Sequence, residues 1–183
     1  MNIFERYTGA CNHPSDINEH LPVLRNLSEK CSHITEFGVR KPTSTYAFLV
    51  ADPEYIISYD IEKHPEVDTI IHPAFKFVLG NTLEIEIEET DFLFIDTWHT
   101  YKQLSQELVL HAGKVKKYIG FHDVFSFGSM DECDYSEQPQ RVYGDGPGLM
   151  KAILEFLTAN PEWRVIYQTA KNNGLMIISR VHD

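Results

Sequence analysis

Two short stretches carry the side chains best suited to acid–base and metal chemistry. The first contains Asp96 and, three residues later, His99, while the second is the adjacent pair His122 and Asp123. Each stretch follows an apolar run of strand length, and neighbouring parallel strands lie about 4.8 Å apart, so we expect Asp96 and Asp123 to be close neighbours. Two carboxylates at that distance repel each other unless a proton or a cation lies between them.

The residue types suggest a role for each member of this group. Carboxylate oxygens suit Mg²⁺ and an imidazole suits a softer ion, so we predict a divalent-cation site at Asp96, His122 and Asp123. The usual pKa of histidine lies near physiological pH, so His99 is the predicted general base, with Asp96 as its catalytic partner. For His122 a purely structural hydrogen bond to a loop remains an alternative.

A glycine-containing loop follows an earlier apolar run and reads Glu36-Phe37-Gly38-Val39-Arg40-Lys41-Pro42-Thr43-Ser44. Gly38 permits a tight turn and close approach of a ligand to the backbone, and Thr43 or Ser44 can cap the next helix. With a single glycine the loop lacks the dinucleotide pattern, and alone it indicates only a strand–turn–helix. Asp60 ends the next run about 20 residues later, the spacing at which an acid accepts hydrogen bonds from ribose hydroxyls, so the pair predicts a nucleoside site.

Strand-like and helix-like patterns alternate along the chain. Apolar runs rich in β-branched and aromatic residues predict strands at 34–37, 55–59, 75–79, 92–95, 118–121, 164–167 and 175–178. Helical spacing of apolar residues appears at 101–112 and 149–157. Near the start, Asp16 and Glu19 resemble a capping box ahead of Leu21, Leu24 and Leu27, with Pro22 shortening that helix.

This alternation predicts an α/β fold with a mostly parallel sheet. The last two runs leave no room for a helix between them, so they predict an antiparallel hairpin. We expect a single domain over 1–183, with an N-terminal helical segment at 1–32 and a loop at 124–148 that covers the substrate. Ligands of open α/β sheets bind beyond the carboxyl ends of the strands, where the residues named above fall.

Composition narrows the class of protein. The 183 residues are 43% hydrophobic and carry a formal net charge of −11, which fits one globular domain and disfavours nucleic acid and anionic membranes as partners. The three cysteines form no C-x-x-C pair, and no apolar run is long enough to span a bilayer. We therefore predict a cytoplasmic protein, with a homo-oligomer left open.

Several of these stretches together resemble class I S-adenosylmethionine-dependent methyltransferases, and among them the macrocin and cephalosporin-cluster type of small-molecule O-methyltransferase. The similar segments are 34–40 with 44–45, 57–60, 94–101, 120–124, 160–163 and 172–175. The most specific element is Asp-x-x-His-x-Tyr at 96–101, followed one strand later by the His-Asp pair.

The resemblance implies a Rossmann-like, seven-stranded sheet with a C-terminal antiparallel hairpin and helices on both faces. It implies S-adenosylmethionine as cofactor, with Mg²⁺ or another divalent cation held at Asp96 and Asp123 and with His99 as base. The cofactor-binding residues it implies are Glu36, Gly38, Val39, Arg40, Ser44, Asp60, Asn81, Thr82 and Asp96. The reaction implied is methyl transfer to a hydroxyl of a sugar or natural-product-like molecule.

Two other functions compete with this interpretation. A domain that binds the adenosyl nucleoside without transferring a methyl group would need Glu36, Gly38 and Asp60 but no metal. A metal-dependent hydrolase built on Asp96, His99, His122 and Asp123 is the third hypothesis, and it leaves the Gly38 turn and Asp60 unexplained.

Overall fold

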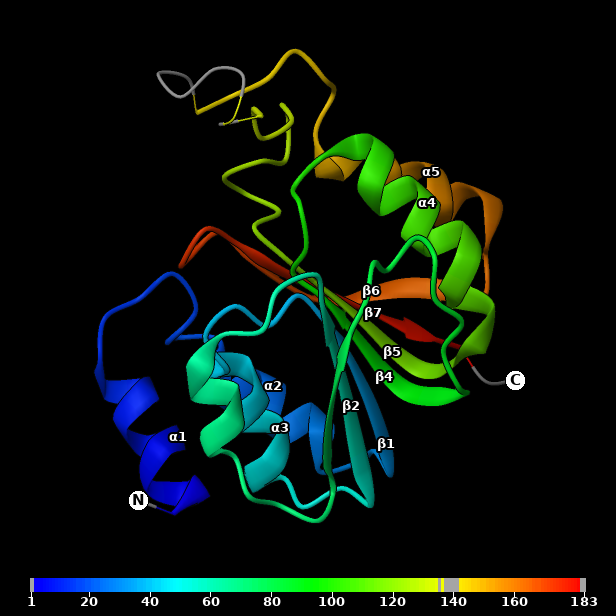
Figure 1. Cartoon of the computed structure of the whole chain (residues 1–183). Coiled ribbons are helices and arrows are strands. Elements are labelled where there is room, and N and C mark those ends of the chain that lie inside the picture. Colours follow the sequence, from blue (N-terminus) through cyan, green and yellow to red (C-terminus); the bar gives the residue numbers. More distant parts are fainter. Residues whose placement is uncertain (1, 135, 137–141, 182–183) are drawn as a thin grey trace.

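The computed structural model describes residues 2–134, 136 and 142–181, and within them it contains one seven-stranded sheet (Figure 1). The strand order is β3-β2-β1-β4-β5-β7-β6. The strands are β1 (His33–Phe37), β2 (Tyr55–Asp60), β3 (Phe75–Leu79), β4 (Thr90–Ile95), β5 (Val115–His122), β6 (Trp163–Thr169) and β7 (Leu175–Arg180). The first five are parallel, while β7 runs antiparallel to β5 and β6 antiparallel to β7. The predicted fold class, including the terminal hairpin, is confirmed.

Helices cover both faces of the sheet, as Figure 1 shows. They are α1 (Ile3–Asn12), α2 (Leu21–Ser28), α3 (Thr43–Val50), α4 (Tyr101–His111) and α5 (Leu149–Ala159), with short 3-10 turns at η1 (Pro65–Thr69) and η2 (Ala112–Lys114). The first three helices pack with one face of the sheet through Ile34, Ile56 and Phe92. Helices α4 and α5 pack on the other face, against residues such as Leu93 and Ile119. Side chains alternate along a strand, so each central strand supplies both hydrophobic cores.

The helix starts differ from the prediction at two places. Helix α2 begins after His20, and in the described chain no side chain caps it, so Asp16 and Glu19 do not form the predicted capping box. The capping box belongs instead to α1, where Asn2 and Glu5 bond each other's backbone N–H groups. Likewise, the described residues supply α3 with no side-chain cap, because Ser44 turns its hydroxyl to a buried carboxylate instead.

The strand register brings the candidate site residues to one level. Phe37 pairs with Tyr59 and with Ile95, and Ile95 pairs with Phe121. The residue after each of these is Gly38, Asp60, Asp96 or His122, so four predicted site positions lie at or directly after the carboxyl ends of four neighbouring strands. None of the described helices is both long and apolar enough to cross a membrane.

Candidate functional site

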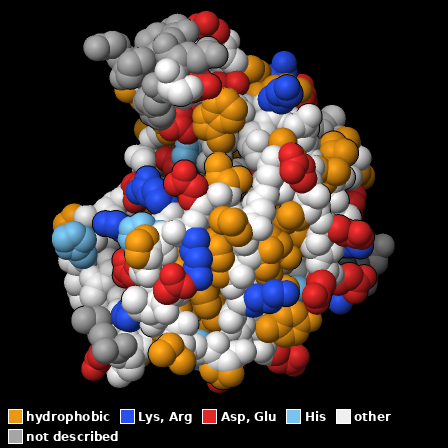
Figure 2. Space-filling model, viewed as in Figure 1, with side chains coloured by type: hydrophobic (Ala, Val, Ile, Leu, Met, Phe, Trp, Pro, Cys, Tyr) orange, Lys and Arg blue, Asp and Glu red, His pale blue; other side chains and the backbone are white. Residues whose placement is uncertain are grey.

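A cleft of about 930 Å³ opens at the carboxyl ends of the parallel strands. Figure 2 shows acidic and histidine side chains gathered in the hollow beneath the upper part of the molecule. The predicted site residues that line the cleft are Gly38, Val39, Arg40, Ser44, Asp60, Asn81, Thr82, Asp96, His99 and Asp123. Small-molecule and cofactor pockets span about 300–1,000 Å³, so this cleft has room for a nucleoside cofactor and an acceptor.

Gly38 makes the turn from β1 into the cleft. Its φ is +80°, and a Cβ at this position would lie 2.0 Å from the backbone oxygen of Asp96. Only glycine therefore fits, because a side chain would both strain the backbone and collide with the end of β4. Gly38 lines the cleft and has no side chain, so its backbone is open to close approach by a ligand, as predicted.

Asp60 shapes the same loop from the neighbouring strand. Its Oδ2 accepts hydrogen bonds from the backbone N–H groups of Val39 at 2.8 Å and Arg40 at 2.9 Å, and its Oδ1 accepts one from Glu62 N–H at 3.0 Å. The carboxylate thus holds the loop in place while it also lines the cleft. Asp60 therefore has a structural role in holding the loop, and its contact with ribose remains a prediction.

Glu36 lies beneath the loop and not among the described residues that line the cleft. Its carboxylate is fully buried and accepts hydrogen bonds from three hydroxyls, those of Ser44 at 2.5 Å, Ser58 at 2.6 Å and Thr45 at 2.8 Å. Burial raises the pKa of Glu36 to about 7 despite these hydrogen bonds. In this arrangement Glu36 ties α3 to β1 and β2, so its link to a cofactor would be indirect.

Asn81 and Thr82 also line the cleft. The Thr82 hydroxyl donates to the Glu107 carboxylate of α4 at 2.6 Å, and the same carboxylate accepts from the Thr97 hydroxyl at 3.0 Å and the Gln103 amide at 2.9 Å. Burial raises the pKa of Glu107. The sequence reasoning missed Glu107, because a glutamate in the middle of a helix looks like an ordinary surface residue.

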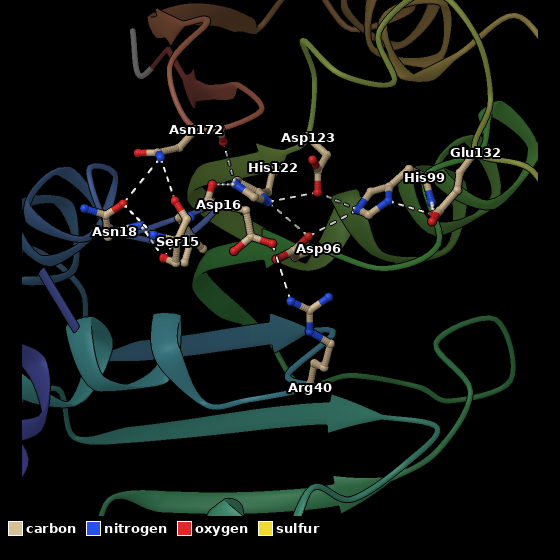
Figure 3. Close-up of polar contacts among 11 residues, drawn as sticks. Ser15, Asp16, Asn18, Arg40, Asp96, His99, His122, Asp123, Glu132 and Asn172 are labelled. Atoms are coloured by element: carbon tan, nitrogen blue, oxygen red, sulfur yellow. Dashed lines mark hydrogen bonds and ion pairs between the residues drawn. The ribbon is translucent and has the colours of Figure 1, made fainter. Parts of the chain in front are cut away.

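The predicted acid and histidine residues meet in one cluster (Figure 3). His99 Nε2 lies 2.9 Å from Asp123 Oδ2 and 3.3 Å from Asp96 Oδ1, and its Nδ1 lies 2.9 Å from Glu132 Oε2. His122 Nδ1 lies 3.2 Å from Asp96 Oδ1 and 3.1 Å from Asp123 Oδ2. Both histidines therefore bridge the two aspartates that were predicted to be neighbours.

The charges in this cluster shift the pKa values of the two histidines and the two aspartates. Burial alone would lower the pKa of His99, but hydrogen bonds to Asp123, Asp96 and Glu132 raise it to about 12. Burial likewise opposes charge on His122, yet Asp96 and Asp123 raise its pKa to about 10. The pKa of Asp96 correspondingly lies well below its usual range.

This places a condition on the predicted role of His99. With a carboxylate partner at each ring nitrogen, the imidazole carries a proton on both and has no lone pair for an incoming proton. It acts as a base only when another cation takes over its aspartate partners. The base role stays a prediction, and it is coupled to the prediction of a cation site.

Residues remote in the sequence orient the two rings. The backbone oxygens of Asp16 and Asn172 lie 3.0 Å and 3.2 Å from His122 Nε2. The His99 ring stacks on Phe127 at 5.0 Å between centroids, with Glu132 at its far nitrogen. Sequence reasoning missed Glu132 and the two carbonyl groups, since each contributes from an irregular segment without a recognisable pattern.

A cation is compatible with the cluster, but its donors differ from those expected for Mg²⁺. Oxygens of Asp96 and Asp123 and nitrogen of His99 lie within 4.8 Å of one another, a spacing that could hold a metal ion. The buried Oδ1 of Asp123 has no hydrogen-bond partner among the described residues. Mg²⁺ prefers oxygen ligands and retains several waters, whereas one of the three donors here is the imidazole nitrogen of His99, which also suits a softer ion.

Comparison with solved structures identifies the architecture. The chain is similar to an O-methyltransferase from Bacillus cereus in complex with S-adenosylhomocysteine, with a TM-score of 0.66 and 14% identity, over 97% of this chain and 88% of that one. It is also similar to the tomaymycin-synthesis O-methyltransferase from Streptomyces achromogenes in complex with S-adenosylmethionine, with a TM-score of 0.65 and 12% identity, over 97% and 90% of the chains.

An N-methyltransferase from Bradyrhizobium japonicum with S-adenosylhomocysteine shares the fold over 100% of both chains, with a TM-score of 0.63 and 11% identity. No protein-family model matches the sequence, and no curated protein matches it. The chain therefore shares its Rossmann-like fold with these proteins, and its cleft lies at the carboxyl ends of the strands, where open α/β sheets bind ligands.

Proposed function

We propose that this protein is an S-adenosylmethionine-dependent methyltransferase that acts on a hydroxyl group of a small molecule. The observation that carries the proposal is the cleft itself. Gly38, Asp60, Asn81 and Thr82 line one part of it, and the Asp96, His99 and Asp123 cluster lines another. A nucleoside half and a polar reaction half thus share one continuous space, within a fold also found in methyltransferases that bind the cofactor or its product.

The residues fit the nucleoside in chemical type. Bare backbone at Gly38 allows close approach, and Asp60 and Asn81 offer hydrogen-bonding groups on the cleft wall. S-Adenosylmethionine, when bound, supplies a methyl group already activated by its sulfonium. The tasks left to the chain are to align the acceptor, to exclude water and to manage the hydroxyl proton.

We propose an oxygen acceptor because two of the similar structures are O-methyltransferases. Carboxylates on the cleft wall can accept a hydrogen bond from a hydroxyl and orient its oxygen. Asp96 is the best placed, because its side chain is 26% exposed whereas that of Asp123 is 7% exposed. We retain Asp96 and His99 as the candidate catalytic pair, and a sugar or natural-product-like acceptor as the substrate class.

Calorimetric titration with S-adenosylhomocysteine tests the first half of the proposal. We expect one molecule to bind per chain, and we expect Asp60→Asn to weaken binding by about fivefold. The variant replaces charge-assisted hydrogen bonds to the loop by neutral ones, a loss of roughly 1 kcal/mol. Glu86→Gln is the matched control, because its side chain is 85% exposed and pairs with Lys114, a residue not among those that line the cleft.

Transfer of an isotope-labelled methyl group to a panel of sugars and phenolic natural products tests the second half. Labelled product from hydroxyl acceptors supports the proposal. Tight nucleoside binding without transfer to any acceptor would favour the non-catalytic binding domain. Failure to bind the nucleoside at all would remove the proposed function.

A further inference from the structure

A buried glutamate on α4 gathers three polar side chains from the wall of the cleft. Glu107 is fully buried, and the cleft-lining residues Thr82, Thr97 and Gln103 all donate hydrogen bonds to its carboxylate. Thr82 follows β3, Thr97 follows β4, and Gln103 lies in the first turn of α4. One carboxylate therefore orients the polar atoms of a wall that is built from three separate segments.

The amide of Gln103 has one favourable orientation in this arrangement. Its Nε2 donates to Glu107 Oε1 at 2.9 Å and to Thr82 Oγ1 at 3.1 Å. Turning the amide over would place its oxygen, which only accepts hydrogen bonds, against a carboxylate oxygen. Both hydrogens of Nε2 are thus used, and Oε1 has no hydrogen-bond partner among the described residues. Because Gln103 lines the cleft, Oε1 is the polar atom that it offers to a ligand.

The two threonines of this wall are also committed as donors. Thr82 gives its hydroxyl hydrogen to Glu107 Oε1 at 2.6 Å, and Thr97 gives its own to Oε2 at 3.0 Å. A hydroxyl has a single hydrogen, so each can then only accept a hydrogen bond from a ligand. The buried His111 fixes the loop as well, because its Nε2 donates to the backbone oxygen of Thr82 at 2.7 Å. The side chains tied to Glu107 therefore present acceptors to the cleft.

Asn81, which the sequence predicts at the nucleoside, uses its amide for the turn in which it lies. Its Oδ1 accepts from Leu83 N–H at 3.0 Å, and its Nδ2 donates to Glu84 Oε1 at 3.1 Å. An asparagine that bonds its own backbone two residues on is a common device of tight turns. Of the two amides on this wall, the one with an unused oxygen is that of Gln103.

This wall adjoins the residue predicted to hold the ribose. Asp60 pairs with Leu79 at the end of β3, and Thr82 follows three residues later. Asp60, Thr82 and Gln103 line one continuous cleft. The neutral groups of the wall suit a nucleobase, whereas the charged cluster around Asp96 suits the reacting groups. A nucleoside with its ribose at Asp60 can therefore extend its base toward Gln103.

We infer that Glu107 sets the base selectivity of the cofactor site, by holding the Gln103 amide so that its oxygen accepts a hydrogen bond from the 6-amino group of adenine. The inference rests on the proposed function for the identity of the nucleoside. Adenine carries a donor at position 6, whereas the hypoxanthine base of inosine carries an acceptor there. A wall of acceptors binds the first and opposes the second. Gln103 is the specificity-determining residue, and Glu107, which acts through it, is a positioning residue.

Affinities for two nucleosides test the inference without any methyl transfer. S-Adenosylhomocysteine and S-inosylhomocysteine are titrated calorimetrically into the full chain. The adenosyl compound should bind about 10–100-fold more tightly, because the inosyl compound loses a hydrogen bond and sets its 6-oxo group against the Gln103 oxygen. The analogue with only hydrogen at position 6 should bind with an affinity between the two. Equal affinities, or tighter binding of the inosyl compound, would overturn the inference.

Substitutions identify the residues that make the selection. In Glu107→Gln the new amide cannot accept all three hydrogen bonds, so the Gln103 amide is free to turn and donate to the 6-oxo group. The ratio of the two affinities should fall by about fivefold or more, and Gln103→Leu should lower it as well. The matched controls Gln106→Leu and Glu86→Gln should leave the ratio unchanged, because both side chains are exposed and neither residue is among those that line the cleft.

The ratio distinguishes base selection from general damage. A variant that merely loosens the cleft weakens both nucleosides alike and leaves the ratio as it was. Circular dichroism checks that each variant folds, and Gln103→Leu, at a half-buried position, carries the test if Glu107→Gln does not.

The outcomes also separate this inference from the proposed function. If the wild type selects adenine but Glu107→Gln keeps the full ratio, Glu107 does not position the amide and the inference is wrong. If both nucleosides bind the wild type equally, the inference fails while the proposed function stands. If neither nucleoside binds, the proposed function fails and the inference falls with it.

Discussion

The buried carboxylate of Glu36 makes the sharpest prediction about stability. Its pKa is raised from 4.5 to about 7 in the folded chain, mainly because burial disfavours the charge. A group whose pKa is raised on folding stabilises the protein fully below its unfolded pKa, and that stabilisation is lost as the pH rises through the folded pKa. The free energy of unfolding should therefore fall between about pH 4.5 and pH 7 on account of this residue.

The magnitude follows from the shift. A difference of about 2.5 pKa units corresponds to roughly 3 kcal/mol at 1.36 kcal/mol per unit, of which about 2.5 kcal/mol lies between pH 5 and pH 8. Glu36→Gln keeps the size of the side chain and removes its titration. The difference in unfolding free energy, wild type minus variant, should fall by about 2.5 kcal/mol across that interval.

Urea unfolding of the ligand-free chain at several pH values measures this difference. Comparing two proteins at each pH cancels the contributions of the other titrating groups. Glu86→Gln, at a side chain that is 85% exposed, controls for the loss of one negative charge from the chain. A difference that stays constant within about 0.5 kcal/mol from pH 5 to pH 8 would refute the reasoning, because it would mean that burial does not disfavour the Glu36 charge.

Two further substitutions, one of them with a matched control, test how the cleft is built. Gly38→Ala should destabilise the chain by several kcal/mol in urea unfolding, because φ is +80° there and the new Cβ would lie 2.0 Å from a backbone oxygen. The control Gly9→Ala places its Cβ where nothing lies within 4 Å, and it should stabilise the chain by about 0.5–1 kcal/mol. Asn172→Gly keeps the positive φ but loses a 2.7 Å hydrogen bond to Ser15 O and one of 3.0 Å from Glu19 N–H, so hydrogen exchange of the segment before α2 should accelerate. An unchanged exchange rate there would show that the turn does not hold this segment.

The sequence predicted the sheet well because its signal is local. Each predicted run of apolar and β-branched residues became a strand. The central strands β1 and β4 are buried along their whole length, and a strand buried on both faces needs such side chains throughout. The closeness of Asp96 and Asp123 was predicted because each follows one of two neighbouring parallel strands, and the structure brings the two carboxylates together. Alternating strands and helices left few other ways to arrange the chain.

The errors arose where two local interactions competed for one side chain. Ser44 has the right type and position to cap α3, but the Glu36 carboxylate beneath it is buried and needs donors. Leaving a buried carboxylate without partners costs more than an uncapped helix start, so the hydroxyl turns inward. Glu36 was predicted to face the cofactor, and whether a strand-end side chain points into the cleft or beneath it depends on packing that the sequence pattern does not reveal.

The orientation of the two cluster histidines could not be predicted for a different reason. Asp16, Glu132 and Asn172 come from three irregular segments, and none is near His99 or His122 in the sequence. Their contacts exist only once the sheet, the N-terminal segment and the β6–β7 turn are assembled. The turn is central, because Asn172 also bonds Ser15 O through its side chain and thereby links the N-terminal segment to β5.

This dependence on the assembled fold has a consequence for the cluster. Two histidines close to two aspartates could form many arrangements in a flexible chain, yet only rings with fixed far nitrogens present a single nitrogen each toward one point. Here a carboxylate fixes one ring and two carbonyls fix the other, and the ring stacked on Phe127 has an interplanar angle of only 2°. The outer partners therefore fix how both imidazoles face the aspartates, and a cation at the predicted site would find its donors already ordered and would cost little conformational entropy to bind.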